Sequence, residues 1–267
     1  MRAYRIAYDG QPFYGFQRQP DVTTVEDTIL DALRALDVLG TTADTPPGYA
    51  AAGRTDAGVS ALAQTVAFDA PDWLTPAALN SELPADVRAW ASADAPDEFH
   101  ATHDATSRTY TYYLHAPDAS DERARDALDA LAGEHDFHNL TPDDNGTVRT
   151  LSPALDREGP FLVVELTAGG FARQLVRRIV SVVAEIAQRD APLARIEQVL
   201  APEPLDGPEG VAPAPATGLV LTGVTYPTLE FAVDETAAAS ARAVFERQRV
   251  DRATRSRVAG ALTDYRE

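Results

Sequence analysis

A short stretch bounded by glycines holds an acidic and a basic residue that could take part in chemistry. Gly53-Arg54-Thr55-Asp56-Ala57-Gly58-Val59 places Arg54 and Asp56 between two glycines. Glycines let the backbone turn sharply and let a ligand approach it closely. A carboxylate held beside an arginine stays ionised, which suits a nucleophile better than a general base. The same spacing also fits a tight turn whose Asp caps a helix or bonds its own backbone.

Three further segments combine aromatic and basic residues in ways that fit contacts with nucleic acid. Residues 11–19 mix aromatic and amide side chains with Arg18, and residues 107–114 alternate so that Arg108 and Tyr110 share one face of a strand. A helix predicted over 171–188 aligns Arg173 with Arg177, adds Arg178, and contains no acid before residue 185. The alternatives are a packed loop, aromatic packing on a sheet and a solvated basic edge.

Composition restricts the class of protein. The chain has 267 residues, of which 45% are apolar, so a large core can form, and no apolar run is long enough to span a bilayer. Its start lacks the apolar stretch of a signal peptide, so we expect a cytoplasmic protein without membrane contact. There is no Cys, which excludes disulfides and thiolate sites. The histidine pairs His100/His103 and His135/His138 lack typical metal-ligand spacing, so we expect no metal.

The charge balance is unusual for a protein that binds nucleic acid. Net charge is −18, and all 23 basic residues are Arg. Affinity for phosphate comes largely from basic groups, so this acidity by itself argues against nucleic acid as a partner. An acidic, Lys-free surface also fits a salt-saturated cytoplasm, where carboxylates keep a surface hydrated. We therefore predict a halophilic origin, with positive charge kept where it is needed.

Hydrophobic periodicity and turn residues indicate an α+β fold rather than a parallel sheet. The predicted strands cover residues 3–8, a segment ending near 69, 86–91, 107–114, the hairpin 147–157 with 161–168, and 218–226. The predicted helices begin near Thr23 and Thr75 and cover residues 121–132, 171–188, 191–200 and 237–265. A boundary near residue 105 divides the chain into domains 1–105 and 106–267, with a helical C-terminal extension from about residue 228.

Several of these segments resemble one family. Gly53 to Val59 is similar to the signature of the tRNA pseudouridine synthase A family, with seven consecutive matching residues. Four other blocks resemble the same family: Tyr8-Asp9-Gly10 with the following aromatic segment, Phe99-His100-Ala101, Arg108-x-Tyr110-x-Tyr112, and Phe171 with Val176 and Arg177. The resemblance extends over about residues 1–227. It departs at Phe16, Ser60, Thr102 and the pair Arg173-Gln174, where the family usually has Trp, His, Arg and two His.

The resemblance implies a function and a site. Asp56 corresponds to the nucleophile that isomerises uridine to pseudouridine in the anticodon arm of tRNA, usually at positions 38, 39 and 40. Tyr110 corresponds to the residue that stacks on the target uracil, and Arg177 corresponds to an active-site Arg. Our hypothesis is that Arg54 and Arg177 orient the Asp56 carboxylate and nearby phosphates, with Tyr110 as a candidate proton acceptor. We assign RNA contacts to four further arginines: Arg18, Arg108, Arg173 and Arg178. The alternatives are a non-catalytic tRNA-binding module and a carboxylate-dependent N-glycosidase.

The family also implies an architecture and a reaction without a cofactor. It implies two similar domains, each a mainly antiparallel sheet with helices on one face, joined around a central cleft. We expect a homodimer, tRNA as the partner, and no cofactor. The sequence does not choose whether Asp56 attacks C6 of the uracil, attacks C1′ of the ribose, or assists a glycal route.

Overall fold

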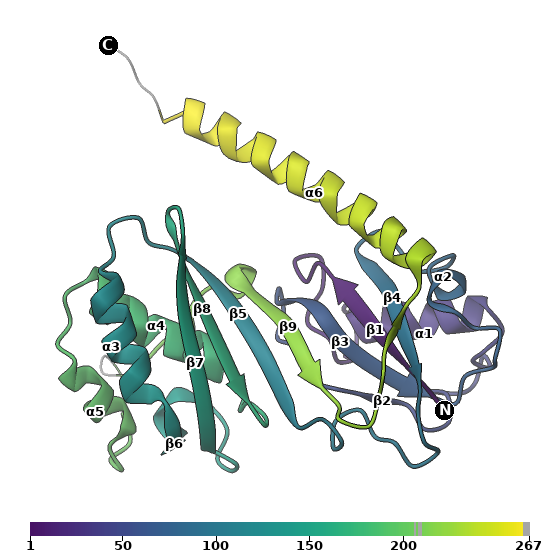
Figure 1. Ribbon diagram of the computed structural model, residues 1–267, viewed down its shortest axis with the longest axis horizontal. Coiled ribbons are helices and arrows are strands. Elements are labelled where there is room, and N and C mark those ends of the chain that lie inside the picture. Colours follow the sequence, from purple (N-terminus) through teal and green to yellow (C-terminus); the bar gives the residue numbers. More distant parts are fainter. Residues whose placement is uncertain (206, 208–209, 264–267) are drawn as a thin grey trace.

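The computed structural model describes residues 1–205, 207 and 210–263 (Figure 1). The first half of the chain contains four strands and two helices. In chain order they are β1 (Arg2–Tyr8), α1 (Val25–Ala35), β2 (Ala50–Ala51), β3 (Ser60–Phe68), α2 (Pro76–Leu79) and β4 (Val87–Asp94). Helix α1 begins where the sequence predicts, because the Thr24 side chain accepts a hydrogen bond from the backbone N–H of Asp27.

Among its described residues, the second half adds six strands and four α-helices. They are β5 (Ser107–His115), α3 (Asp121–Leu131), β6 (Gly133–Asp136), β7 (Val148–Glu158), β8 (Phe161–Ala168), α4 (Leu175–Gln188), α5 (Ala194–Leu200), β9 (Leu219–Thr225), β10 (Ala232–Val233) and α6 (Glu235–Ala261). Short 3₁₀ turns lie at His138–Leu140 and Ala216–Gly218. The predicted hairpin forms as β7 and β8.

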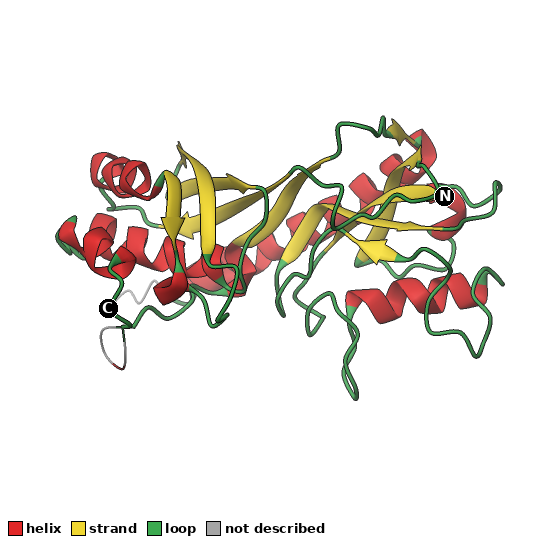
Figure 2. Ribbon diagram, turned by 90° about the horizontal axis from the view of Figure 1, so that it is seen from below, coloured by secondary structure: helices red, strands yellow, loops and turns green. Residues whose placement is uncertain are grey.

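One ten-stranded sheet runs through both halves. Its strand order is β10-β4-β1-β3-β9-β5-β8-β7-β6, with β2 paired to β3. Every pairing is antiparallel except β3 with β9, where Ser60 lies opposite Val220 and Ala61 opposite Leu221. Figure 2 shows the strands through the middle of the molecule with helices towards both ends. Strand β9 therefore joins the two halves, since it pairs with β3 on one side and β5 on the other.

Two hydrophobic clusters cover this sheet, one in each half. The first packs α1 against β1, β3 and β4, and includes the fully buried side chains of Tyr4, Ile29 and Phe68. The second packs α3, α4 and α5 against β5, β7 and β8, and includes Leu128, Leu166 and Ile179. The chain is thus a mixed α/β protein with two cores on one continuous sheet. The division into two domains at residue 105 stays a prediction.

The last part of the chain returns to the first half. Strand β10 pairs with β4, and the first turns of α6 pack against β4 and α2. Helix α6 then extends across the top of the molecule in Figure 1. The helix predicted over 237–265 is present as far as Ala261, and residues 264–265 lie outside the described part of the chain.

The sequence-based start of α4 is wrong by four residues. The prediction began at Phe171, but the helix begins at Leu175, because Gln174 lies in the left-handed region with φ of 60°. The backbone N–H of Arg173 is bound instead by the side chain of Asp143, at 2.8 Å. Arg173 therefore precedes the helix, and the predicted alignment of Arg173 with Arg177 on one helical face does not form.

Candidate active site

A cleft of about 1470 Å³ opens between the two cores. Its walls come from the loop after β1, the segment between β2 and β3, a turn at His100–His103, strand β5 and the residues from Gly170 to Arg177. Asp56, Tyr110 and Arg177 all line it, although they come from three separate parts of the chain. The cleft therefore brings together the residues for which the sequence predicts chemistry.

Asp56 lies on a loop that is held by its own backbone and by the loop after β1. Within the loop, the backbone N–H of Val59 donates to the carbonyl of Asp56 at 3.1 Å. From outside, the N–H of Phe16 donates to the carbonyl of Thr55 at 3.0 Å, and the N–H of Gly58 donates to Phe13 at 3.3 Å. Gly58 has φ of 80°, a conformation that L side chains rarely adopt, so a glycine is needed there.

Side chains from the sheet support the same loop from behind. The Tyr8 hydroxyl lies 2.7 Å from Oγ1 of Thr55, and Nε2 of Gln64 donates to the carbonyl of Gly53 at 2.8 Å. Both Tyr8 and Gln64 are buried. These positioning residues were not among those predicted, because their contacts with the loop depend on how β1 and β3 pack behind it. The Tyr8-Asp9-Gly10 block was the signal that could have found the first of them.

Ser60 joins the loop after β1 to the start of β3. Its Oγ accepts a hydrogen bond from the backbone N–H of Gly10 at 3.0 Å. Gly10 packs so tightly that a Cβ there would lie 2.0 Å from the carbonyl oxygen of Val59. At the position where the family usually has His, this chain thus has a small side chain that holds the Asp56 loop.

The carboxylate of Asp56 forms an ion pair with Arg177 across the cleft. Oδ2 of Asp56 lies 3.1 Å from Nη1 of Arg177, and the two side chains are 28% and 15% exposed. Nε of Arg177 donates to the carbonyl of Ala214 at 2.6 Å, which fixes the guanidinium. No helix follows Asp56, because β3 begins at Ser60, so the alternative of a helix cap does not apply. The pairing orients a carboxylate that is still open to a ligand.

Tyr110 projects from β5 into the same cleft. Its ring packs edge-on against Phe171, with 5.2 Å between the centroids. Burial raises the pKa of Tyr110 to about 12, the nearby Asp56 carboxylate adds to the rise, and Arg108 opposes it. The phenol therefore stays protonated at neutral pH, which suits stacking and hydrogen bonding better than proton abstraction.

Arg54 differs from the other arginines of the cleft because it is unbonded. It lines the cleft and is exposed. Within the described part of the chain, Arg54 makes no hydrogen bond or ion pair, and its sequence neighbour Asp56 pairs with Arg177 instead. The free guanidinium can contact a phosphate or a base that enters the cleft.

Arg108 is a buried arginine with a structural environment. Arg108 is 8% exposed, and its guanidinium donates to the backbone carbonyls of Ala52, Thr102, Ala105 and Gly169. The bond to Ala52 ties β5 to the start of the Asp56 segment, at 2.9 Å. This bonding favours a positioning role for Arg108 over the RNA contact predicted from the sequence.

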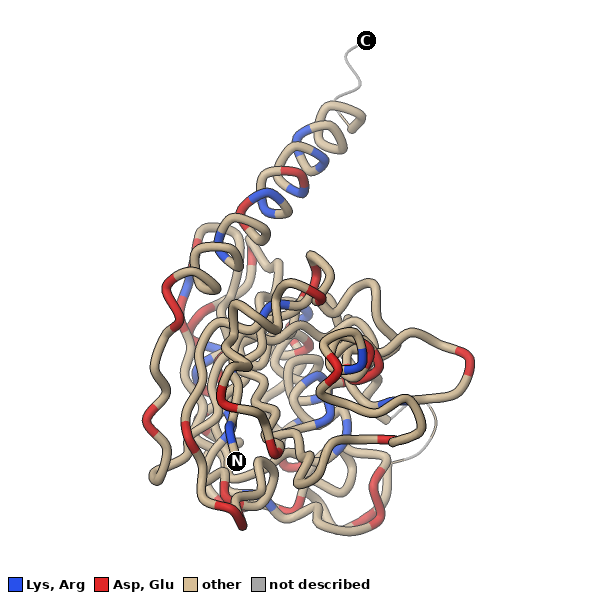
Figure 3. The backbone as a smooth tube through the Cα atoms, turned by 90° about the vertical axis from the view of Figure 1, so that its right-hand side faces the viewer, with Lys and Arg blue, Asp and Glu red and all other residues tan. Residues whose placement is uncertain are grey.

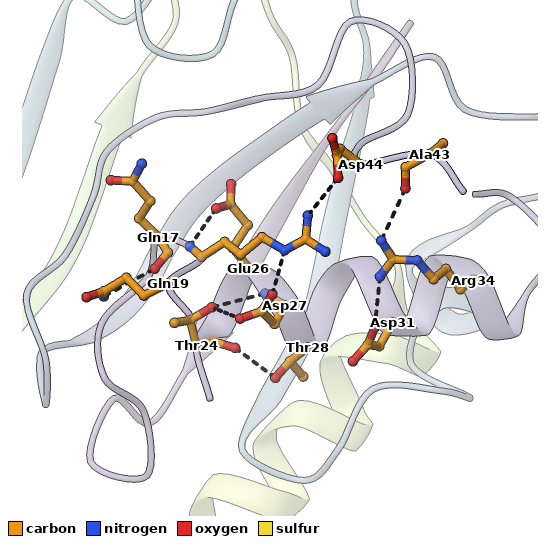
Figure 4. A network of polar contacts seen from close by, with 11 residues as sticks. Gln17, Gln19, Thr24, Glu26, Asp27, Thr28, Asp31, Arg34, Ala43 and Asp44 are labelled. Atoms are coloured by element: carbon orange, nitrogen blue, oxygen red, sulfur yellow. Dashed lines mark hydrogen bonds and ion pairs between the residues drawn. The ribbon is translucent and has the colours of Figure 1, made fainter. Parts of the chain in front are cut away.

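The remaining predicted arginines are bonded within the protein. Arg18 pairs with Asp27 at 2.9 Å and Asp44 at 3.5 Å, in the network beside α1 that Figure 4 shows. Arg173 pairs with Asp143 at 3.2 Å at the edge of the cleft, and its side chain is 58% exposed. Arg178 does not line the cleft, since it donates to the carbonyl of Val211 and to Gln174. The RNA contacts assigned to these three stay predictions.

Two histidines and a threonine also border the cleft. The rings of His100 and His103 lie 4.2 Å apart, and Oγ1 of Thr102, where the family usually has Arg, donates to the carbonyl of Ala51 at 2.5 Å. Over the described residues, the structure gathers no three His, Asp or Glu side chains in a metal-binding arrangement. In the same residues, no helix has the length and apolarity needed to cross a membrane.

Known proteins resemble this chain along almost its whole length. A family model described as tRNA pseudouridine synthase matches residues 127–227, a range that contains Arg177 but not Asp56. A protein from Haloarcula marismortui named tRNA pseudouridine synthase A is 60% identical over 99% of each chain. One of the same name from Natronomonas pharaonis is 60% identical over 98% of this chain and 99% of its own. An archaeal box H/ACA sRNP Nop10-Cbf5 complex matches with a TM-score of 0.38 at 10% identity, over 70% of this chain and 43% of that one, which is too low for any argument.

Proposed function

The chain belongs to the tRNA pseudouridine synthase A family, and we propose that it isomerises uridines of the tRNA anticodon arm through the carboxylate of Asp56. Enzymes of this family are isomerases, and the 60% identity to haloarchaeal relatives agrees with the halophilic origin expected from composition. The observation that carries the proposal is the ion pair between Asp56 and Arg177 in the cleft beside Tyr110. It joins the loop before β3 to helix α4, so the site exists only in the folded chain.

The proposed reaction exchanges one bond for another without loss of atoms. The bond between C1′ of the ribose and N1 of the uracil breaks, the base turns, and C1′ bonds to C5. The proton lost from C5 is balanced by the proton gained at N1, so neither oxidant nor water is consumed. Protein groups therefore need only to hold the turned base, supply a nucleophile or counter-charge, and move a proton.

Each cleft residue has a part in this proposal. The target uridine leaves its stack, which costs a few kcal/mol, and stacking on Tyr110 offsets about 1–3 kcal/mol of it. Arg177 holds the Asp56 carboxylate in position across the cleft. Arg54 is exposed at the mouth of the cleft, where it can bind the phosphate or occupy the space left by the uridine. The raised pKa of Tyr110 makes it a hydrogen-bond donor rather than a phenolate base.

Three routes for Asp56 remain within the proposal. The carboxylate can add to C6 of the uracil, attack C1′ of the ribose, or balance charge while a glycal forms by loss of the C2′ proton. Only the glycal route breaks the bond between C2′ and its hydrogen. A tRNA transcript with deuterium at C2′ separates the glycal route from the other two, since a primary isotope effect on single-turnover isomerisation indicates the glycal.

The finer expectations from the resemblance also belong to this proposal. We expect positions 38, 39 and 40 as targets, tRNA as the partner, a homodimer, a cytoplasmic location and a reaction without cofactor or metal. The cleft supports a nucleic-acid substrate, because arginines line it in a chain of net charge −18. Mapping pseudouridine along tRNA after treatment with the protein would test the target positions.

Analysis of the products separates the proposed function from its alternatives. An unmodified tRNA transcript is incubated with the protein and digested to nucleosides. The isomerase converts uridine into an equal amount of pseudouridine and releases no free uracil. An N-glycosidase releases free uracil, and a binding module yields neither product. Repeating the assay at several salt concentrations tests the halophilic origin, which predicts activity at molar salt.

A further inference from the structure

Helix α6 is a basic segment in an acidic protein. It carries six arginines and three carboxylates, a net charge of +3, whereas the rest of the chain carries −21. All six arginines lie between Arg242 and Arg257, with two acids among them. Figure 3 shows the helix projecting from the body with several blue segments along it. The cleft residues do not account for this concentration of positive charge.

Helix α6 is buried only at its base, although Gln248 and Arg252 further along bond to Asp86 and Asp9. Its buried side chains are Ala237, Ala238, Ala241 and Val244, all in the first three turns. The Asp234 side chain caps the helix and also accepts from the backbone of Ala77 in α2. From Asp251 to Ala261 every residue is exposed. The outer half thus gains nothing from a core of this chain, which indicates that its surface is available to a partner.

Three arginines of α6 have no partner in the described part of the chain. Arg249 and Arg255 pair with Glu246 and Asp251 on the same helix, and Arg252 pairs with Asp9. Arg242, Arg247 and Arg257 are exposed and make neither a hydrogen bond nor an ion pair among the described residues. Arg247 also lies near a further positive charge, that of Arg88 on β4. Burial and the positive charge of Arg247 both lower the pKa of Arg88. Such a group of unneutralised guanidinium ions favours an anionic ligand.

The pattern fits nucleic acid better than another protein surface. Arginines and acids recur from Arg242 to Arg257, and Val250 is the exposed large apolar side chain of that segment, whereas Val258 and Leu262 lie beyond the last arginine. Protein interfaces are generally built on an apolar core from which charge is depleted. Guanidinium groups bind phosphate oxygens in pairs of hydrogen bonds, a direct contact that persists when salt screens longer-range attraction.

We propose that the exposed arginines of α6, from Arg242 to Arg257, form a second RNA-binding surface that contacts the phosphate backbone of the tRNA outside the cleft. The inference rests on tRNA being the substrate. Twenty-seven residues give the helix a length of about 40 Å, enough to contact RNA well beyond the target nucleotide. Arg252 joins this arm to Asp9, and the adjacent Gly10 packs on the Asp56 loop, so arm and active site are held in a fixed relation.

A matched pair of double variants tests this surface. One variant combines Arg247→Gln with Arg257→Gln on α6. The other combines Arg125→Gln on α3 with Arg189→Gln after α4, two exposed arginines outside the cleft. Both variants lower net charge by the same amount. Affinity for an unmodified full-length tRNA transcript is measured by titration over a range of potassium chloride in which circular dichroism shows the fold intact.

The expected result separates the two variants. The α6 variant should bind tRNA roughly 10-fold more weakly than the unmodified protein. Its slope of log affinity against log salt should fall by about 2, because each of the two substituted arginines no longer neutralises a phosphate. The control variant should stay within about 2-fold of the unmodified protein. At saturating tRNA the α6 variant should form pseudouridine at the normal rate, since the cleft is unchanged.

Two results would overturn the proposal: equal tRNA affinity of the two variants, and an unchanged tRNA affinity of the α6 variant. If the second result came with a halved sedimentation mass of the α6 variant, α6 would be assigned to contact with a second copy of the chain. Failure of the proposed function is recognised separately. In that case the unmodified protein makes no pseudouridine, while the comparison of affinities still decides the role of α6.

Discussion

The Asp56 loop and helix α6 differ in how the fold holds them. The loop is bonded to the segment after β1, to strands β1 and β3, and through Asp56 itself to α4. Helix α6 is buried only at its base, and its outer half is exposed along its length and attached through the ion pair of Arg252 with Asp9. A carboxylate that must meet one atom needs several points of attachment, whereas a surface that binds phosphates needs charge and length.

The arginines follow the same division. Arg108 and Arg177 donate to backbone carbonyls and have fixed orientations, while Arg242, Arg247 and Arg257 have no partner among the described residues. Removing Arg108 or Arg177 should therefore lower stability or catalysis, and removing one of the three unpaired arginines of α6 should change binding alone. Substitutions on the two sides of this division should differ in effect. The predictions below begin with the largest expected effect and end with the smallest.

Arg108→Gln should lower the free energy of unfolding by about 3 kcal/mol or more. The change leaves the buried carbonyls of Ala52 and Ala105 without their charged donor, and each unpaired buried group costs about 1–3 kcal/mol. Arg54→Gln is the control, because Arg54 is exposed and unbonded, and it should cost less than about 0.5 kcal/mol. Urea unfolding at fixed salt measures both. Equal losses for the two variants would break the division.

Arg177→Gln should slow pseudouridine formation about 100-fold, which corresponds to about 2.7 kcal/mol. The Asp56 carboxylate then loses the cation that lies 3.1 Å away and keeps it aimed. Arg177→Lys preserves the charge without the second donor and should recover part of the rate. Single-turnover kinetics with unmodified tRNA provide the measurement. A rate equal to that of the unmodified protein would remove Arg177 from the mechanism.

Arg252→Gln should lower the free energy of unfolding by about 1–3 kcal/mol, because its partner Asp9 is 7% exposed and would lose its cation. Arg255→Gln, on the same helix, breaks an exposed pair with Asp251 and should cost less than about 0.5 kcal/mol. Urea unfolding of the two variants compares the attached and the free part of α6. Similar costs would show that α6 is held along more of its length than the structure indicates.

Stability should fall as pH rises above 10. Burial raises the pKa of Tyr110 and of Tyr226 to about 12, against an ordinary value near 10. Between these values the unfolded chain loses the phenolic protons while the folded chain keeps them, so unfolding is favoured by up to about 1.4 kcal/mol per pH unit for each tyrosine. Tyr110→Phe should reduce the slope. Tyr14→Phe, which removes an exposed hydroxyl, serves as the control, and equal slopes for the two variants would contradict the assignment.

Local patterns in the sequence were enough to predict most elements. The Thr24 cap predicts the start of α1, and the alternation around Gly159 predicts the β7–β8 hairpin. The Gly53–Val59 signature directed attention to the Asp56 loop. These features depend on neighbouring residues, so they can be read without knowing the tertiary structure.

Long-range contacts could not be predicted from those patterns. Asp56 and Arg177 are 121 residues apart, and β9 joins the halves by pairing with both β3 and β5. The carbonyls that bind Arg108 come from several separate segments, so its burial was not foreseen. Gln174 has a left-handed conformation, so Arg173 precedes α4 instead of lying within the predicted helix. Each depends on which parts of the chain meet, which composition and spacing do not specify.

The Asp56→Asn variant tests the central claim most directly. Asparagine keeps the shape of the side chain but cannot form a covalent bond as a carboxylate does or carry its charge. Pseudouridine formation in unmodified tRNA should fall at least about 1000-fold, while tRNA affinity stays within about 2-fold of the unmodified protein. Isomerisation at an undiminished rate in this variant would contradict the assignment of Asp56 as the reacting group.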